Sequence, residues 1–233
     1  MTHLPAHSTL KLGWLLTLIM HYTSEETIPT VVVDNFFETP SLVAQYARQQ
    51  QYFKCTEHPA GGTWPGKRTP LLDKLDPILH QKICSKLIRY LPHHMGFEIA
   101  DMTFHISTEE TGNGWIHTDP PHLGIGVVIY LNDGIRKNTG TALYDVPPGY
   151  SGQMYETEFK SQMSAESQEE RDTFADVQQK CNEDFRMSIN VEERFNRCII
   201  FDGRKYHGAV GLYGDNPENA RLTLVAFLRG VLK

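Results

Sequence analysis

The sequence predicts a mainly β domain of the jelly-roll kind, preceded by a short strand and flanking helices. Three observations lead to this prediction. The chain has 233 residues, a length at which a single jelly-roll-like domain is common. From residue 97 onward, short β-branched and aromatic runs follow one another and are separated by turn residues. Before residue 97, apolar residues instead recur at helical spacing.

The first 96 residues are expected to form a strand, two helices and a loop. VVVDNFF at residues 31–37 has the composition of a strand. Thr39-Pro40-Ser41 is a helix-start signal, and residues 57–70 contain enough glycine and proline to predict a loop. Residues 75–91 repeat apolar side chains at helical spacing and end at Pro92, which predicts an amphipathic helix.

The β core is expected over residues 97–230, within one domain that comprises the whole chain, residues 1–233. We expect an insertion at residues 151–194, because that segment is rich in Glu, Gln, Arg and Ser and its apolar residues are thinly spaced. It is predicted to be mostly helical and to lie on the solvated surface. The alternative is that it acts as a lid. The strands are predicted at residues 97–107, 115–118, 124–131, 141–146, 197–201, 208–210 and 221–228.

The N-terminus carries an apolar run, LKLGWLLTLIM at residues 10–20, which is too short to span a bilayer as a helix. It lacks the basic region and the cleavage site of a signal peptide. We expect it to pack as a helix or strand of a protein that binds no membrane. The alternative is that Met20 is the natural start and residues 1–19 are an upstream extension.

Charge and cysteine content narrow the class of protein. The formal net charge of −6 disfavours a nonspecific nucleic-acid binder, which would carry a basic face. The four cysteines, Cys55, Cys84, Cys181 and Cys198, match no zinc pattern and no redox pair. Free thiols predict a reducing, cytoplasmic location. The oligomeric state stays open.

The most informative motif is His117-Thr118-Asp119. Residues two apart on a strand point to the same face, so the imidazole and the carboxylate converge on one point. A distant histidine would complete the facial triad of non-haem iron(II) oxygenases, which leaves coordination positions open on one side of the metal. His207 is the candidate third ligand, and His105 or His122 is the alternative. His122 could instead contact the substrate, and Trp64 and Trp115 could line its pocket.

Several segments follow this triplet in a recognisable order. They are WIHTD, the strand that ends in IYLN, the glycine before TALY, FDGRKYHG, and the strand RLTLVAFL. In this order the chain resembles the 2-oxoglutarate- and iron(II)-dependent oxygenase superfamily, on its prolyl-hydroxylase-like branch, over roughly residues 97–230. The stretch VVVDNFF followed by a helix is similar to phage and bacterial members.

The resemblance implies a double-stranded β-helix, a cupin-like jelly roll that is buttressed by N-terminal helices. It implies that His117, Asp119 and His207 bind Fe(II), and that Arg221 pairs with the distal carboxylate of the cosubstrate 2-oxoglutarate. An arginine suits this role because its planar fork makes two parallel hydrogen bonds to a carboxylate. Thr223 and Tyr130 would add hydroxyl groups to the same site.

Two departures from the family pattern leave alternatives open. The gap from Asp119 to His207 is long, which the insertion would explain. The step from His207 to Arg221 is also long; a protruding turn at residues 214–217 would explain it. If the register differs instead, Arg204 or Lys205 is the substitute anchor.

The implied activity is that of a dioxygenase. It would use O2 and 2-oxoglutarate to hydroxylate a C–H bond of an amino acid, a peptide or a small metabolite, and would release succinate and carbon dioxide. The alternatives are a cupin-like metalloenzyme that does not use 2-oxoglutarate, and a non-catalytic binding protein on a jelly roll. The sequence does not identify the primary substrate.

Overall fold

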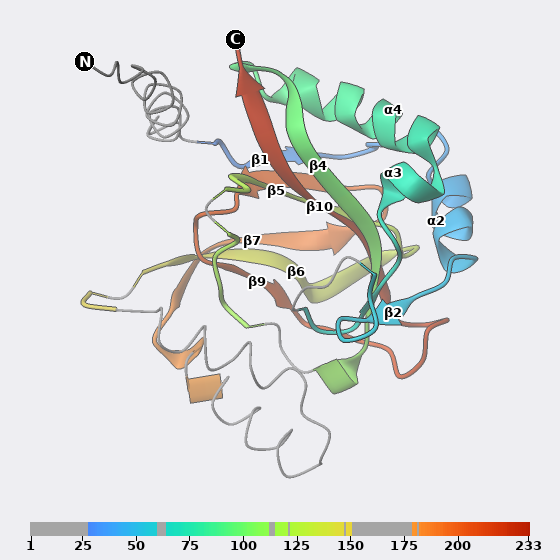
Figure 1. Cartoon of the computed structure of the whole chain (residues 1–233). Coiled ribbons are helices and arrows are strands. Elements are labelled where there is room, and N and C mark those ends of the chain that lie inside the picture. The colour runs from blue at the N-terminus through green and yellow to red at the C-terminus, as the bar shows by residue number, and fades with distance from the viewer. Residues whose placement is uncertain are drawn as a thin grey trace, which may run out of the picture.

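The computed structural model describes residues 28–59, 64–111, 115–120, 122–146, 148–150, 179–180 and 182–233 (Figure 1). Two expectations therefore lie outside the described residues. These are the apolar run at residues 10–20 and most of the predicted insertion, residues 151–178. Within the described residues, no helix is both long and apolar enough to cross a bilayer.

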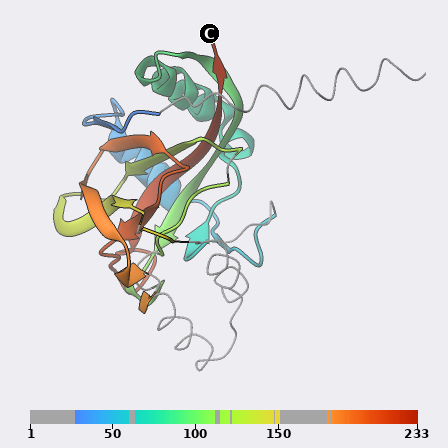
Figure 2. The ribbon, with the colours of Figure 1, turned by 90° about the vertical axis from the view of Figure 1, so that its left-hand side faces the viewer.

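The described strands form two antiparallel sheets, of which the larger has seven strands. The two longest strands, β4 (His94–Ser107) and β10 (Arg221–Leu232), pair side by side through the molecule (Figure 2). The strands predicted at residues 97–107, 124–131, 197–201 and 221–228 are confirmed as members of this sheet. Its full order is β1 (Val31–Val33), β8 (Cys198–Asp202), β5 (Ile125–Tyr130), β10, β4, β3 (Lys67–Arg68) and β2 (Phe53–Lys54).

The smaller sheet consists of β7 (Arg186–Arg194), β6 (Ile135–Asp145) and β9 (His207–Val210), in that order. From β4 onward the chain passes back and forth between the two sheets, which is the double-stranded β-helix topology. The strands predicted at residues 141–146 and 208–210 are confirmed as parts of β6 and β9. The predicted strand at residues 115–118 is reduced to a single bridge, in which His117 pairs with His207.

The predicted helical insertion at residues 151–194 is wrong over its last part, because Arg186–Arg194 form strand β7. Strand β7 pairs on one side with β6 and lies at the edge of the small sheet. Most of its residues are exposed, whereas Val191 and Glu193 are buried. An edge strand with one solvated face can carry many charged residues, which is why its composition looked helical.

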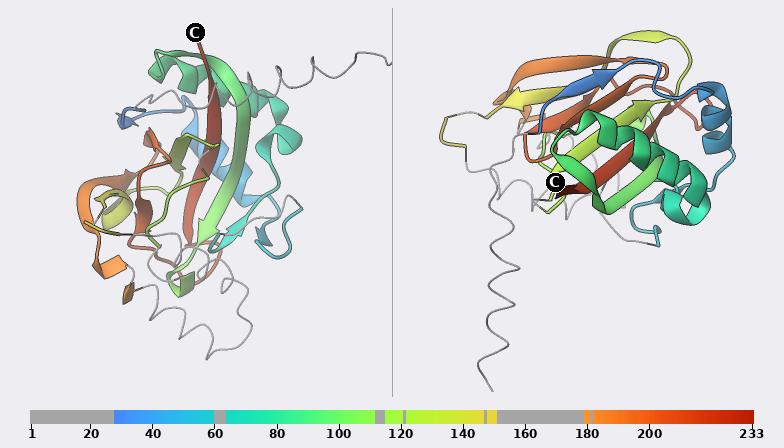
Figure 3. Two further views of the ribbon diagram at one scale, coloured as in Figure 1. Left: turned by 60° about the vertical axis from the view of Figure 1, so that its left-hand side comes forward. Right: turned by 90° about the horizontal axis from the view of Figure 1, so that it is seen from above.

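The helices cover one face of the large sheet. Helix α2 (Pro40–Arg48) begins at the predicted proline, and α3 (Leu72–Leu75) precedes α4 (Pro77–Leu87) and a 3-10 turn at Ile88–Tyr90. Helix α4 begins two residues later than predicted, because the Asp76 side chain caps it by accepting a hydrogen bond from the backbone N–H of Leu79 (2.9 Å). Figure 3 shows α4 against β4 and β10 from two further directions.

The large sheet divides its side chains by the period-two rule of strands. Met102 and Phe104 of β4, with Leu222 and Leu224 of β10, are buried in the apolar core that also contains Leu87 of α4. The residues between them point to the other face, toward the small sheet. They are polar and yet buried: Thr103, His105, Ser107, Arg221 and Thr223. Of this polar row, His105 and Arg221 line the cavity of the candidate site.

Candidate active site

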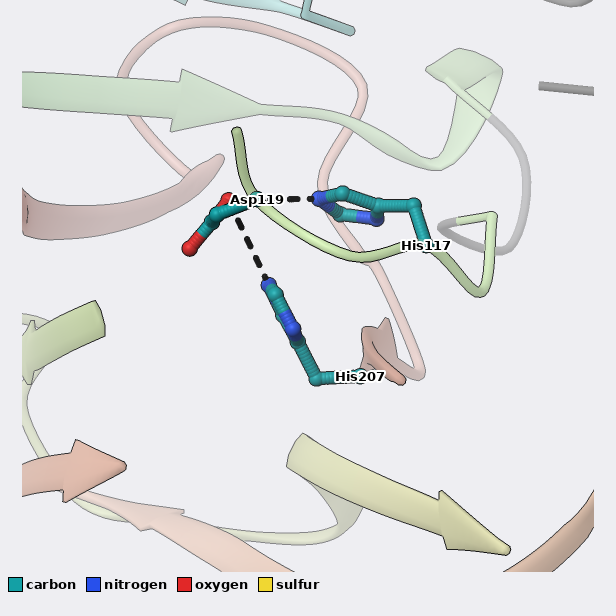
Figure 4. A group of neighbouring side chains, drawn as sticks. All are labelled: His117, Asp119 and His207. Atoms are coloured by element: carbon teal, nitrogen blue, oxygen red, sulfur yellow. Dashed lines mark ion pairs between the residues drawn. The ribbon is translucent and has the colours of Figure 1, made fainter. Parts of the chain in front are cut away.

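Backbone pairing brings three predicted ligands together. His117 and His207 exchange backbone hydrogen bonds of 3.0 and 2.9 Å, and the backbone N–H of Asp119 donates to the carbonyl of Gly203 (2.8 Å). A Cβ at position 203 would lie 2.7 Å from the Asp119 carboxylate, so only glycine fits there without a shift. The side chains of His117, Asp119 and His207 therefore converge (Figure 4).

The atoms of this cluster are spaced as ligands rather than as hydrogen-bonding partners. Oδ1 of Asp119 lies 3.8 Å from Nε2 of His117 and 3.7 Å from Nε2 of His207. Both separations exceed a normal N–H to O hydrogen bond. One ligand atom from each of the three residues lies within 4.8 Å of the others. Asp119 and His207 are buried, while His117 is partly exposed.

The backbone fixes which imidazole nitrogen faces the centre. Nδ1 of His117 lies 3.1 Å from the carbonyl oxygen of Trp115, and Nδ1 of His207 lies 2.9 Å from that of Lys205. A carbonyl oxygen only accepts hydrogen bonds, so each Nδ1 carries the proton and donates it. Each Nε2 is then left with its lone pair directed at the cluster, as a metal-binding histidine requires.

The cluster lies in a cavity of about 360 Å³ between the two sheets. The wall is mainly apolar and includes both tryptophans that the sequence analysis singled out. Its polar side chains include His105, Thr141 and two arginines, Arg68 and Arg221. The apolar lining includes Trp64, Trp115, Phe201, Val225 and Phe227.

Arg221 is buried at one side of this cavity, with only 3% of its surface exposed. Its Nε donates to Oε2 of Glu193 (3.2 Å), and its Nη2 donates to the carbonyl of Gly140 (3.2 Å). Glu193 is itself buried and accepts a short hydrogen bond of 2.5 Å from the hydroxyl of Tyr213. Arg221 thus belongs to a neutral buried pair and retains N–H groups for a further acceptor.

Buried hydroxyl groups surround Arg221. Thr223 lies two residues along the same strand, and Ser107 is directly opposite Arg221 across the β4–β10 pair. Oγ1 of Thr223 and Oγ of Ser107 are buried and make no hydrogen bond within the described residues. The hydroxyl of Tyr130 instead donates to Oγ1 of Thr141 (2.8 Å), so Thr141 is the member of that pair that lines the cavity.

The alternative ligands and anchors lie elsewhere. His105 lines the cavity, but its Nε2 donates to the carbonyl of Pro65 (2.7 Å). Burial, aided by Arg68, lowers the pKa of His105 to about 3, so the ring is neutral at physiological pH. His122 is exposed, and Arg204 pairs with Asp202 (2.8 Å); neither lines the cavity, nor does Lys205.

Arg68 is a second cavity arginine that sequence reasoning missed. Its guanidinium lies 4.6 Å from the ring centroid of Trp64 and 5.0 Å from that of Phe227. Its Nε is buried and donates no hydrogen bond to any described residue. Burial lowers the pKa of Arg68 to about 10, with Asp119 acting in the opposite direction, so the side chain stays cationic at neutral pH.

Comparison with known proteins places the chain in a family. The model of a family of unknown function, DUF6445, matches residues 16–228. The chain belongs to this family. No curated protein sequence matches it.

Solved structures show what fold the DUF6445 chain shares. HygX from Streptomyces hygroscopicus, solved with nickel and 2-oxoglutarate bound, has a TM-score of 0.53 and 9% identity, covering 97% of this chain and 88% of that chain. A Pseudomonas putida prolyl-4-hydroxylase has a TM-score of 0.46 and 12% identity, covering 87% and 92%. A 2OG-Fe(II) oxygenase-family oxidoreductase from Burkholderia pseudomallei has a TM-score of 0.48 and 10% identity, covering 97% and 93%. The likeness to HygX confirms the predicted double-stranded β-helix of the 2-oxoglutarate oxygenases as the fold of this chain.

Two charged residues of this site had no signal in the sequence that pointed to them. Glu193 stands in a segment of mixed charge, where nothing distinguishes it from its solvated neighbours. Arg68 stands in a loop rich in glycine and proline. The inward orientation of Glu193 becomes evident only in the structure, where buried Val191 and Glu193 alternate with exposed residues at the end of β7.

Proposed function

We propose that this protein is a 2-oxoglutarate- and iron(II)-dependent dioxygenase that hydroxylates a C–H bond of an amino acid, a peptide or a small metabolite. The observation that carries the proposal is the cluster of His117, Asp119 and His207 in a mainly apolar cavity. Two imidazoles and one carboxylate are the donor set of the facial triad that non-haem iron(II) oxygenases use.

The residues fit a divalent metal. Asp119 contributes the charge, and the two neutral imidazoles are held in the required tautomer by Trp115 and Lys205. Hydrogen bonds of this kind orient metal-binding histidines and raise their basicity. His117, Asp119 and His207 would then hold the iron, and His105 would not, since its Nε2 proton is committed to Pro65.

The residues around Arg221 fit the distal carboxylate of 2-oxoglutarate. Arg221 keeps N–H groups beyond those that contact Glu193 and Gly140. Among the described residues, the hydroxyls of Thr223 and Ser107 have no hydrogen-bond partner, although both are buried on the same face. This arrangement is costly, and a carboxylate would relieve it. HygX, which has this fold, binds nickel and 2-oxoglutarate.

Iron and 2-oxoglutarate, once bound, supply the oxidation: O2 and the cosubstrate are consumed, one oxygen atom enters succinate as carbon dioxide leaves, and the other enters the substrate. The chain's own groups do the positioning. His117, Asp119 and His207 would hold the metal at the cavity, where the aromatic rings of Trp115 and Phe201 line the space beside it.

One observation favours a second candidate, a metalloenzyme on this fold that does not use 2-oxoglutarate. Glu193 already neutralises Arg221 at 3.2 Å, so a carboxylate ligand would meet a pair rather than a lone cation. In this alternative His117, Asp119 and His207 still bind a metal, and Arg221 only stabilises the fold.

The test is anaerobic titration of the purified protein with Fe(II) and then 2-oxoglutarate, followed by admission of O2. We expect the visible charge-transfer band of the iron chelate to form, and succinate to appear as O2 is consumed. Asp119→Ala is the control and should give neither. No band and no succinate above that control would refute the proposal. Metal-dependent turnover without 2-oxoglutarate would favour the second candidate.

A further inference from the structure

We propose that Arg68 binds a carboxylate group of the primary substrate, which makes that substrate a small organic acid with an apolar body. This inference rests on the proposed function, and it assigns to Arg68 a role distinct from that of Arg221. Arg68 and Arg221 line the same cavity as the His117, Asp119 and His207 cluster.

Among the described residues, no carboxylate forms an ion pair with the Arg68 guanidinium, and its buried Nε donates no hydrogen bond. Asp119 attracts the charge of Arg68 from beyond ion-pair distance. Arg221, in contrast, has Glu193 at 3.2 Å and the carbonyl of Gly140 at 3.2 Å. Charged groups this buried are normally paired. Arg68 is thus the cavity cation that is available to an anion from solution.

The aromatic contacts of Arg68 hold it in the orientation that a carboxylate requires. Trp64 and Phe227 lie within 5.0 Å of the guanidinium carbon, measured to the ring centroids. Stacking uses the faces of the planar guanidinium and leaves its N–H edges free. Those edges make two parallel hydrogen bonds to a carboxylate. The rings also fix the side chain in advance, which reduces the entropy lost when a ligand binds.

The position of Arg68 favours the substrate over the cosubstrate. Arg68 lies against the rings of Trp64 and Phe227. Arg221 instead lies beside Tyr130 and Glu193. The buried hydroxyls that suit the distal carboxylate of 2-oxoglutarate belong to Ser107 and Thr223, next to Arg221. Arg68 is also less completely buried than Arg221, so it is the more accessible of the two cations to a molecule from solution.

The lining defines the rest of the substrate. Trp64 and Phe227, which lie against Arg68, and Val225 line the cavity and offer contact to an apolar or aromatic body. No lysine lines the cavity among the described residues, so the site lacks the additional cations that usually accompany a phosphate. The cavity of about 360 Å³ is near the lower end for ligand sites and must also hold the cosubstrate.

The test compares carboxylates with their own amides. The probes are phenylpropanoate, hexanoate and N-acetyl-leucine, each paired with its carboxamide. Binding is followed by tryptophan fluorescence, because Trp64 and Trp115 line the cavity, both in the anaerobic Fe(II)·2-oxoglutarate complex and in the metal-free protein. We expect at least one carboxylate to bind roughly a hundred-fold more tightly than its amide.

Three variants assign that preference to a residue. Arg68→Met should abolish the preference while leaving the 2-oxoglutarate charge-transfer band unchanged. Arg68→Lys should retain part of it, since the charge remains and the planar fork is lost. Arg89→Met, at an exposed arginine on the 3-10 turn of the helix layer, is the matched control and should change nothing.

The possible outcomes separate this inference from the proposed function. No carboxylate preference in the unmodified protein, or the same preference in Arg68→Met, would overturn the inference. A loss of 2-oxoglutarate binding in Arg68→Met as large as that in Arg221→Leu would overturn it too, because Arg68 would then be the cosubstrate anchor. If the charge-transfer band never forms but the Arg68-dependent preference is present, the proposed function fails and Arg68 stands as a carboxylate-binding residue.

Discussion

The two faces of the large sheet are made by the same strands and yet differ in chemistry. On the helix side, Leu222 and Leu224 of β10 lie in a closed apolar core with Met102 and Phe104 of β4. On the cavity side, the alternate positions are Thr103, His105, Ser107, Arg221 and Thr223, all of which are buried.

The two faces differ in whether their buried side chains have hydrogen-bond partners. The helix face contains side chains that need no partner, whereas three hydroxyls on the cavity face, those of Thr103, Ser107 and Thr223, lack one within the described residues. A buried polar group without a partner destabilises the fold. The helix face therefore carries stability, and the cavity face gives up some stability, which the proposed function explains by the binding of a ligand.

The largest expected effect is at the metal cluster. Asp119→Ala should reduce iron-dependent succinate formation by more than about a hundred-fold, since even outer residues of a metal site cost 10–100-fold in metal affinity. The melting temperature of the metal-free protein should fall little, because the backbone bond from Asp119 to Gly203 is unaffected. Asp145→Ala, at an exposed carboxylate on β6, is the control. Full activity of Asp119→Ala would show that the cavity side does not hold a catalytic metal at Asp119.

The second effect concerns Arg221, whose removal touches both function and stability. Arg221→Leu should weaken 2-oxoglutarate binding by about 3–5 kcal/mol, because the distal carboxylate would be buried without a counter-charge. The same change leaves the buried carboxylate of Glu193 without its counter-charge and should lower stability as well. The chelate absorbance measures the first effect, and denaturation in urea measures the second.

A double variant separates these two consequences. Arg221→Leu combined with Glu193→Gln removes both charges of the pair, so stability should largely return while 2-oxoglutarate binding stays weak. Recovery of the affinity along with the stability would mean that Arg221 acts only as the partner of Glu193. Unchanged affinity in the single variant would favour the metalloenzyme that does not use 2-oxoglutarate.

Arg221 and Glu193 also show how far the sequence could predict the site. The strands that carry Arg221 and the metal cluster are local features: period-two patterns, a His-x-Asp triplet, and His207 after a buried strand. The convergence of His117, Asp119 and His207, and the double-stranded β-helix itself, were anticipated from these motifs and the resemblance that they support.

The missed residues depend on pairing between distant segments. Arg68 reaches the cavity because a two-residue strand in a loop pairs with β4, opposite His105. Glu193 reaches Arg221 because β7 pairs with β6 and faces inward at that position. Neither pairing leaves a periodic signal in a short or highly charged segment, so composition predicted a loop in one case and a solvated helix in the other.

The third prediction tests the helix face. Leu224→Ala deletes a fully buried side chain from the apolar core and should cost about 2–5 kcal/mol of the free energy of unfolding. Binding of 2-oxoglutarate to the folded protein should change by less than about 0.5 kcal/mol, because position 224 points away from the cavity. Urea denaturation and the chelate titration measure the two quantities. A large loss of affinity here would show that the faces are not independent.

The smallest effect concerns a single hydroxyl and gives the sharpest contrast within one face. Thr223→Val keeps the shape of the side chain and removes a buried Oγ1 that has no hydrogen bond in the described residues. The free protein should be as stable as before or slightly more stable, since an unsatisfied polar group is gone. If that hydroxyl donates to the distal carboxylate of 2-oxoglutarate, the affinity should fall by about 1.5–3 kcal/mol, as expected for a hydrogen bond to a charged group.

Thr103→Val is the matched control. Its Oγ1 is also buried on the same face without a hydrogen bond in the described residues, but it lies opposite Val225, further from Arg221 along the strand pair. Both variants should gain or keep stability, and only Thr223→Val should lose affinity. Equal losses of affinity in the two variants would mean that the polar row acts on the ligand as a whole, while no loss in either would place the distal carboxylate away from Thr223.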